Sequence, residues 1–138
     1  MMRNLLTIAL LATGLIGAAT GQESLEQAKL QIHAQRNYLA SLESEHECIR
    51  NSAVFRVMQY RARFPQVDLQ PFVKALREMS EKDSSPQNRL YAFLACTFLE
   101  NGQLLQAAGA PPKQEDEKHT YFLRLQGLMQ GNHALARE

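Results

Sequence analysis

The stretch of sequence that decides the fold is residues 84–102, SSPQNRLYAFLACTFLENG. Ser85 followed by Pro86 is typical of a helix start, because the serine hydroxyl accepts hydrogen bonds from free backbone N–H groups and proline already has the φ angle of the first helical turn. Residues 90–99 are almost entirely apolar. A helix that is apolar on nearly all sides is surrounded by other elements, so we expect a central helix from Pro86 to Glu100.

Apolar residues spaced three and four positions apart predict further helices on both sides of this central one. They cover residues 24–64, 69–79 and 121–129. The polar run from Ser41 to Glu47 is expected to divide the first of these, because one rod of about 60 Å is too long to bury its apolar face against a small domain. No segment alternates as a strand does. The sequence therefore predicts an all-α fold with about five helices.

Local signals set the expected ends of these helices. Ser24 and Gln27 form a capping box where the first helix starts, and Asp68 is a suitable N-cap for the third. Glycine is common at the C-terminal ends of helices, so we expect Gly131 to end the last helix. Residues 103–112 have little pattern and close with two prolines, which indicates a connector containing at most one short helical turn.

The N-terminal 21 residues have the pattern of an export signal. Arg3 gives a positive charge and residues 5–19 are apolar or small, which matches the n-region, h-region and cleavage zone of a signal peptide. As a helix the apolar stretch rises only about 22 Å, short of the roughly 30 Å core of a bilayer. We therefore expect cleavage near residue 21, export to a periplasm or the cell exterior, and no transmembrane anchor in the mature chain. Residues 22–131 then form one helical domain, followed by a frayed tail at 132–138.

The composition fits a globular domain and gives no sign of nucleic-acid binding. The 15 Lys and Arg against 14 Asp and Glu leave a formal net charge of +1, while 45% hydrophobic and 21% charged residues are ordinary values. Seven Gly and five Pro exclude a collagen-like or wholly disordered chain. Because the charge is nearly balanced, nucleic acid is not an expected partner.

Parts of the second and fourth predicted helices repeat at an interval of 39 residues. Arg50 and Ala53 recur as Arg89 and Ala92, and several of the positions that follow are apolar in both copies. Repeats of this length are typical of solenoid proteins, in which helix pairs stack side by side.

The second copy, with the turn Asp83-Ser84-Ser85-Pro86 ahead of Arg89, resembles the turn between HEAT repeats. In that family an aspartate in the turn caps backbone N–H groups, and a nearby arginine neutralises and hydrogen-bonds the carboxylate. The resemblance assigns these roles to Asp83 and Arg89. It covers roughly residues 43–101, and the first copy departs from it because Ser44 stands where the aspartate would fall.

This resemblance implies a short two-layer α-α superhelix. The second and fourth helices would lie side by side and point the same way, with the first, third and last helices in the other layer. Such stacks usually need about three repeat units, and this chain would have two. The end helices would therefore have to cap the stack. The alternative is an irregular helical bundle.

Cys48 and Cys96 are the two cysteines, and the repeat geometry argues against a bond between them. An oxidising compartment and an even count favour a disulfide. In the 39-residue register, however, Cys48 corresponds to residue 87, nine residues before Cys96, which is a stagger of about 13 Å along parallel helices. Neighbouring helix axes add about 10 Å, whereas a disulfide needs α-carbons within about 7 Å. We therefore expect both thiols to be unpaired, and a bond between them would favour the irregular bundle.

No motif for metal binding, a cofactor or catalysis is visible in the sequence. The four histidines and two cysteines lack ligand spacing, and His46 and Cys48 would point about 200° apart on a helix. There is no phosphate-binding glycine loop and no nucleophile elbow. We therefore predict no metal, no cofactor and no enzymatic activity, and instead a non-catalytic binding or scaffold module. The alternatives are a disulfide-linked helical bundle with a ligand-binding or chaperone role in the cell envelope, and an enzyme whose groups converge only in the fold.

Positive charge is concentrated between residues 49 and 77, where Asp68 is the single acidic residue. The basic residues there are Arg50 and five others. The five others are the candidate binding residues: Arg56, Arg61, Arg63, Lys74 and Arg77. Such a patch attracts an anionic partner, either another protein or an anionic envelope component such as a lipid head group or a polysaccharide. The alternative is a solvated face whose charges pair with acidic clusters elsewhere in the chain.

Overall fold

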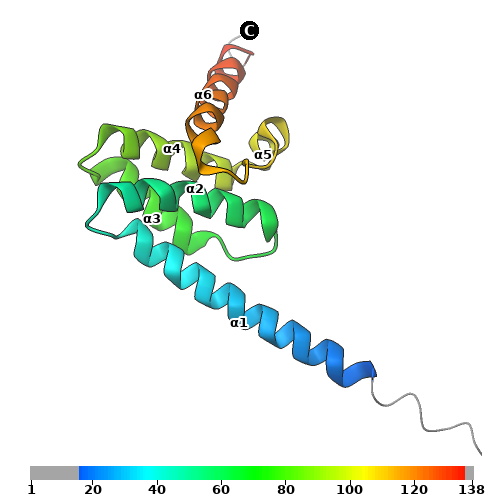
Figure 1. The fold of residues 1–138 in the computed structure, drawn as a ribbon. Helices are drawn as coiled ribbons and strands as arrows, with labels where there is room; N and C mark the ends of the chain where they lie inside the picture. Colours follow the sequence, from blue (N-terminus) through cyan, green and yellow to red (C-terminus); the bar gives the residue numbers. More distant parts are fainter. Residues whose placement is uncertain (1–15, 136–138) are drawn as a thin grey trace, which may run out of the picture. The chain divides into compact units, whose positions relative to one another are not determined.

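The computed structural model describes residues 16–135, and every regular element in that range is helical (Figure 1). The helices are α1 (Ile16–Leu42), α2 (Glu47–Arg63), α3 (Gln70–Lys82), α4 (Pro86–Glu100), α5 (Gly102–Ala108) and α6 (Lys118–Leu135), with a short 3₁₀ helix, η1, at Glu115–Glu117. The all-α prediction is confirmed. Residues 1–15, which hold most of the expected export signal, lie outside the described range, as do residues 136–138 of the expected tail.

The chain divides into two compact units, Met1–Gln35 and Arg36–Glu138. The described part of the first unit is a single run of helix α1. Its apolar side chains Leu25, Leu30 and Ile32 are 56%, 69% and 58% exposed. The apolar core of the described residues therefore lies within the second unit.

The helix ends follow the sequence signals in some places and not in others. Ser85 caps α4, its hydroxyl accepting a hydrogen bond from the Asn88 N–H at 3.4 Å, and α1 and α2 separate within the predicted polar run. Three expected ends are wrong. The N-cap of α3 is Leu69 and not Asp68, whose side chain accepts a hydrogen bond from the Gln70 N–H at 3.0 Å from one residue further out. Helix α1 has already begun before Ser24, whose hydroxyl donates to the carbonyl of Gly21 at 2.9 Å and caps nothing. Helix α6 continues past Gly131, because one glycine within a helix costs only about 1 kcal/mol.

The expected connector after α4 contains a helix of its own. The side chain of Asn101 accepts hydrogen bonds from the N–H groups of Gln103 and Leu104, at 3.0 and 3.2 Å, and so starts α5. Gly109 ends α5 with a φ angle of 73°, a left-handed conformation that glycine adopts without steric cost. The remaining residues of the connector then lead to η1 and α6.

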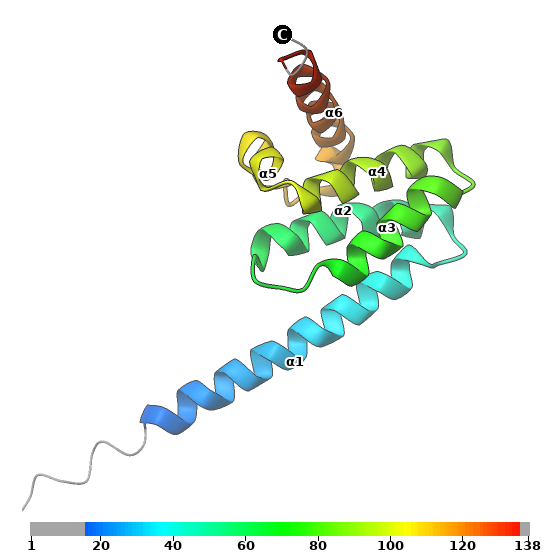
Figure 2. The same ribbon diagram turned by 180° about the vertical axis from the view of Figure 1, so that it is seen from behind.

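Helices α2 and α4 lie side by side and run in the same direction (Figure 1 and Figure 2). Their N-terminal turns are joined by hydrogen bonds: Asn51 Nδ2 donates to Asn88 Oδ1 at 2.8 Å, and Asn88 Nδ2 donates to the carbonyl of Glu47 at 3.3 Å. Asn88 is fully buried, so these bonds satisfy a polar group inside the core. The parallel arrangement implied by the 39-residue repeat is present, while membership of the HEAT family stays a prediction.

A buried ion pair ties the turn before α4 to α2. Arg50 Nε and Nη2 donate to the two carboxylate oxygens of Asp83 at 2.7 and 3.1 Å, and the Asp83 side chain is only 3% exposed. Asp83 Oδ1 also accepts a hydrogen bond from the Ser85 N–H at 2.9 Å. Asp83 therefore caps its own turn, but its carboxylate is paired with Arg50 instead of the expected Arg89. The bidentate contact with Arg50 lowers the pKa of Asp83, although burial opposes this shift.

Arg89 binds the main chain instead, and Arg50 does the same 39 residues earlier. Arg89 Nη1 donates to the carbonyl of Asp83 at 2.7 Å and to the next carbonyl at 3.5 Å. Arg50 Nη1 donates to the carbonyls of Ser44 and Glu45 at 2.9 and 3.1 Å. In both copies an arginine in the first turns of a helix holds the carbonyls six and five residues before it, so the sequence repeat has a structural counterpart.

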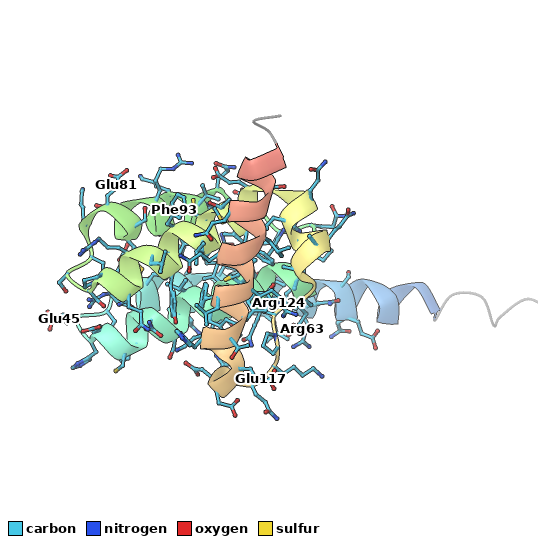
Figure 3. The ribbon with its side chains drawn as sticks, turned by 90° about the horizontal axis from the view of Figure 1, so that it is seen from above. Glu45, Arg63, Glu81, Phe93, Glu117 and Arg124 are labelled. Atoms are coloured by element: carbon cyan, nitrogen blue, oxygen red, sulfur yellow. The ribbon has the colours of Figure 1, made fainter. Side chains whose placement is uncertain are left out.

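The last helix packs across α2 and α4 instead of lying in a layer with α3. Tyr91 of α4 stacks on Phe122 with ring centres 3.9 Å apart. Phe55 of α2 lies 6.1 Å from the same ring and 6.2 Å from Tyr121, which also contacts Phe98 of α4. Figure 3 shows α6 crossing over the parallel helices. The expected layer was wrong here, because the aromatic side chains of α2 and α4 form one shared apolar face that α6 covers.

The ion pair leads to a prediction about stability. Asp83→Ala leaves the guanidinium of Arg50 without its acceptor and the Ser85 N–H without a partner, and we expect the free energy of unfolding to fall by about 2–4 kcal/mol. The measurement is urea unfolding followed by circular dichroism. The double variant Asp83→Ala/Arg50→Met should be less destabilised than the sum of the two single variants, and strictly additive effects would contradict the coupling.

The pKa shift of Asp83 predicts a pH dependence. Because its pKa is lower in the folded state, the stability that this carboxylate contributes is fully present above the ordinary aspartate pKa of about 3.9 and is lost as the pH falls below it. Between about pH 5 and pH 2 the wild-type chain should lose more unfolding free energy than Asp83→Asn, which has no group to protonate there. Equal losses in the two chains would show that the carboxylate contributes nothing to acid sensitivity.

Candidate functional site

An open groove of about 670 Å³ lies between helix α2 and the segment from residue 109 to residue 114, which joins α5 to η1 and is called the connector from here on. The side chains that line it are Arg56, Gln59, Ala62 and Arg63 from α2 and Ala110, Pro111 and Lys113 from the connector. Three of these side chains are cations, one is an amide, three are small or apolar, and none is a carboxylate. The groove therefore combines positive charge with apolar contact surface.

The connector is fixed in place by hydrogen bonds on both sides of the groove. Gln59 Nε2 donates to the carbonyls of Pro112 and Lys113 at 2.6 and 3.4 Å. The hydroxyl of Tyr121 donates to the carbonyl of Gly109 at 2.7 Å. Burial raises the pKa of Tyr121 to about 12, so its hydroxyl keeps its proton at neutral pH. The wall of the groove is thus held by α2 at one end and by α6 at the other.

Charge in and around the groove is only partly balanced. Glu115, just beyond the groove, accepts a hydrogen bond from the hydroxyl of Ser52, and this bond is the main reason that the pKa of Glu115 is lowered. The same carboxylate lies 3.5 Å from Nη2 of Arg56. Within residues 16–135, neither Arg63 nor Lys113 forms an ion pair with a carboxylate. These two side chains carry the uncompensated charge of the groove.

The predicted basic patch is divided between two places. Arg56 and Arg63 line the groove, whereas Lys74 and Arg77 lie on α3 along a separate surface depression. Around the second pair cations and carboxylates are equal in number. Arg77 Nη2 forms an ion pair with Glu100 at 2.8 Å, Lys82 of the same depression pairs with Glu78, and Glu81 lies in the depression with Lys74. The five candidate residues therefore do not form one surface.

Arg61, the fifth residue of the predicted patch, serves the end of its own helix. Its side chain is half-buried, and Nη1 donates to the carbonyl of Pro65 at 2.6 Å. Its Nε is buried and has no hydrogen-bond partner among the described residues. Arg61 thus holds the turn after α2 and does not line the groove.

Gln59 and Lys113 belong to the groove although the sequence pattern does not indicate them. They come together only because the connector folds back onto α2, 53 and 54 residues further along the chain from Gln59. The one local signal is Pro111-Pro112, since consecutive prolines favour an extended backbone that can run beside a helix.

Cys48 and Cys96 are both unpaired in the structure, the first exposed and the second buried. The sulfur of Cys96 lies 3.8 Å from the carbonyl oxygen of Val73 and 3.6 Å from a carboxylate oxygen of Glu100. Burial, and then the Glu100 carboxylate, raises the pKa of the Cys96 thiol. A buried thiol with a raised pKa is a poor nucleophile, so Cys96 has the character of a core residue.

Neither a metal-binding cluster nor a membrane-spanning helix occurs in the part of the chain that the structure describes. Among the side chains that the structure describes, those of residues 21–131, no three His, Cys, Asp or Glu gather in a way that could hold a metal ion. No helix within residues 16–135 is both long and apolar enough to cross a bilayer. His119 Nδ1 lies 2.7 Å from the hydroxyl of Tyr91, with which it forms a hydrogen bond beside the aromatic core.

Comparisons of the chain with protein-family models, with curated proteins and with solved structures gave no match. Its function therefore has to be argued from its own geometry.

The two thiols should differ sharply in reactivity. Without reductant, an alkylating reagent should modify Cys48 in the native protein and reach Cys96 only after unfolding, because one side chain is exposed and the other buried. Mass spectrometry should find one adduct on the folded chain and two in denaturant. A chain that takes up no reagent until a reductant is added contains a disulfide, and this result would contradict the structure.

Proposed function

We propose that the protein is a non-catalytic binding module that holds an acidic segment of a partner protein in the groove between α2 and the connector. One observation carries the proposal: Arg56, Arg63 and Lys113 line a groove that also offers the apolar side chains of Ala62 and Ala110 and has no carboxylate. Such a surface attracts anionic groups and also offers contact area to apolar side chains.

An extended peptide fits this combination well. Guanidinium groups bind carboxylates through paired hydrogen bonds, and the ammonium of Lys113 adds a point charge at the other wall. Small apolar side chains between the cations leave room for the aliphatic residues of the same peptide. The groove is open rather than enclosed, so a segment can lie along it without a conformational change. With so few charges, binding should be moderate and sensitive to salt.

A second candidate partner is an anionic component of the cell envelope, such as a lipid head group. The three cations of the groove would also bind phosphate oxygens, and the expected export signal would bring the protein to that compartment. The disulfide-linked bundle has less support, because both thiols are unpaired.

Charge reversal in the groove tests the proposal against a matched control. The probe is a fluorescein-labelled synthetic peptide of alternating glutamate and leucine, and fluorescence anisotropy measures its affinity. Arg56→Glu/Arg63→Glu should weaken binding by about tenfold or more, because two rim cations become repulsive. Lys74→Glu/Arg77→Glu changes the net charge equally on α3 and should alter affinity by less than about twofold.

The remaining outcomes are also informative. Equal losses in both double variants would contradict a site in the groove, because only the net charge would then matter. Binding of vesicles rich in phosphatidylglycerol, lost in Arg56→Glu/Arg63→Glu and without binding of the peptide, would replace the first candidate by the second. Circular dichroism of each variant confirms that the helices remain folded.

A further inference from the structure

The outer face of α4 is apolar and uncovered. Leu90 and Phe93 are 40% and 52% exposed, and Thr97 continues the same stripe at helical spacing. Figure 3 shows Phe93 to the left of α6 in that view. Each helical residue turns by about 100°, so this stripe lies nearly opposite the stripe that begins at Asn88 and faces α2. We call Leu90, Phe93, Thr97 and the neighbouring Arg89 the outer face of α4.

The matching residues of α2 are in contact with a helix. Moving back by 39 residues, Leu90, Phe93 and Thr97 of α4 correspond to Asn51, Val54 and Met58 of α2. Asn51 is hydrogen-bonded to α4 through Asn88, and Val54 and Met58, on the same stripe, are fully buried. In α2 this stripe is therefore the surface on which the next parallel helix packs. In α4 no helix of the described part of the chain covers the equivalent stripe.

The charged contact of the same interface is also left incomplete. Arg50 binds the carbonyls of its own turn through Nη1 and the carboxylate of Asp83, from the turn of the next helix, through Nε and Nη2. Arg89 makes the first contact through Nη1, but its Nε and Nη2 have no acceptor among the described residues. The position 39 residues after Asp83 is Phe122, which stacks in the core and offers no carboxylate.

We propose that the outer face of α4 binds a helix of a partner protein that runs parallel to α4 and has an aspartate or glutamate in the turn before it. The carboxylate occupies Nε and Nη2 of Arg89, as Asp83 does on Arg50. Because Leu90 stands where α2 has an asparagine, the partner carries an apolar residue where α4 has Asn88. The occupant is thus specified by continuity with the interface that the chain already contains, and this surface is separate from the groove that lies beside α2.

A second copy of the chain cannot repeat the α2 to α4 contact at this face. To do so, the second copy would have to present the α2 residues that correspond, 39 residues earlier, to the stripe of α4 that faces α2. These residues include Ala53 and Tyr60, which are only 3% and 4% exposed. Tyr60 already packs on Tyr38, and Arg56 on the same stripe is paired with Glu115. These contacts block stacking of one copy on another in that register, which favours a different protein as the occupant.

Site-specific cross-linking in the cells that make the protein tests this proposal. The photoreactive residue benzoylphenylalanine replaces Phe93 in the full chain, and the control chain carries it in place of the exposed Glu117, far from α4's outer face. We expect a cross-link at position 93 and not at the control position. It should map to a helix of another protein that has an acidic residue in the preceding turn.

Charge-reversal variants then test whether Arg89 binds the carboxylate of the partner. Arg89→Glu should reduce the cross-link about tenfold, and replacing the partner's acidic residue by arginine should restore it. Leu90→Glu, at an exposed position, should reduce the cross-link as well. This variant leaves the hydrogen bonds of Arg89 to its own turn intact, so its effect cannot come from a weakened turn. Absence of a cross-link at position 93, a cross-link between copies of this chain, equal yields at both positions, or indifference to both variants would overturn the proposal.

Discussion

The ion pair between Arg50 and Asp83 is the contact on which the arrangement of the second unit depends. A single guanidinium binds the carbonyls of the turn before α2 and the carboxylate of the turn before α4. It thereby places the first turns of the two helices at the same level. With that register fixed, the buried amides of Asn51 and Asn88 meet, and Phe55 and Tyr91 form the common face on which α6 packs.

Features set by local signals could be predicted from the sequence, and those that depend on distant partners could not. The capped and almost uniformly apolar helix α4 was predictable, because its serine, proline and apolar run lie next to one another in the chain. The carboxylate partner of Asp83 was not, because Arg89 is close in sequence whereas the actual partner, Arg50, is 33 residues away. Apolar spacing also could not place α6, since the same spacing results whichever neighbour covers the aromatic side chains.

The same distinction between local signals and distant partners applies to the candidate site. Arg56 and Arg63 stood out as part of a basic run. Lys74 and Arg77 belong to the same run, but Glu78 and Glu81 follow them on α3, and the fold adds Glu100, which pairs with Arg77. The only local signal near Lys113 was the preceding Pro111-Pro112, because its place beside α2 depends on the hydrogen bonds that the distant Gln59 donates to the connector. In our proposals the groove and the outer face of α4 are two separate surfaces, one defined by unbalanced charge and the other by uncovered apolar side chains. A module with two such surfaces can hold two partners at once.

The hydrogen bond between Tyr121 and the carbonyl of Gly109 has a consequence for how the protein is made. One wall of the groove belongs to α2, and the other is held partly by Tyr121 of α6, which follows it in the chain. While the ribosome is still adding α6, the earlier helices have already emerged, yet the connector has no anchor on that side. The second anchor of the connector forms only after Tyr121 has emerged, so a chain that stops before this residue presents α2 beside a connector held by Gln59 alone.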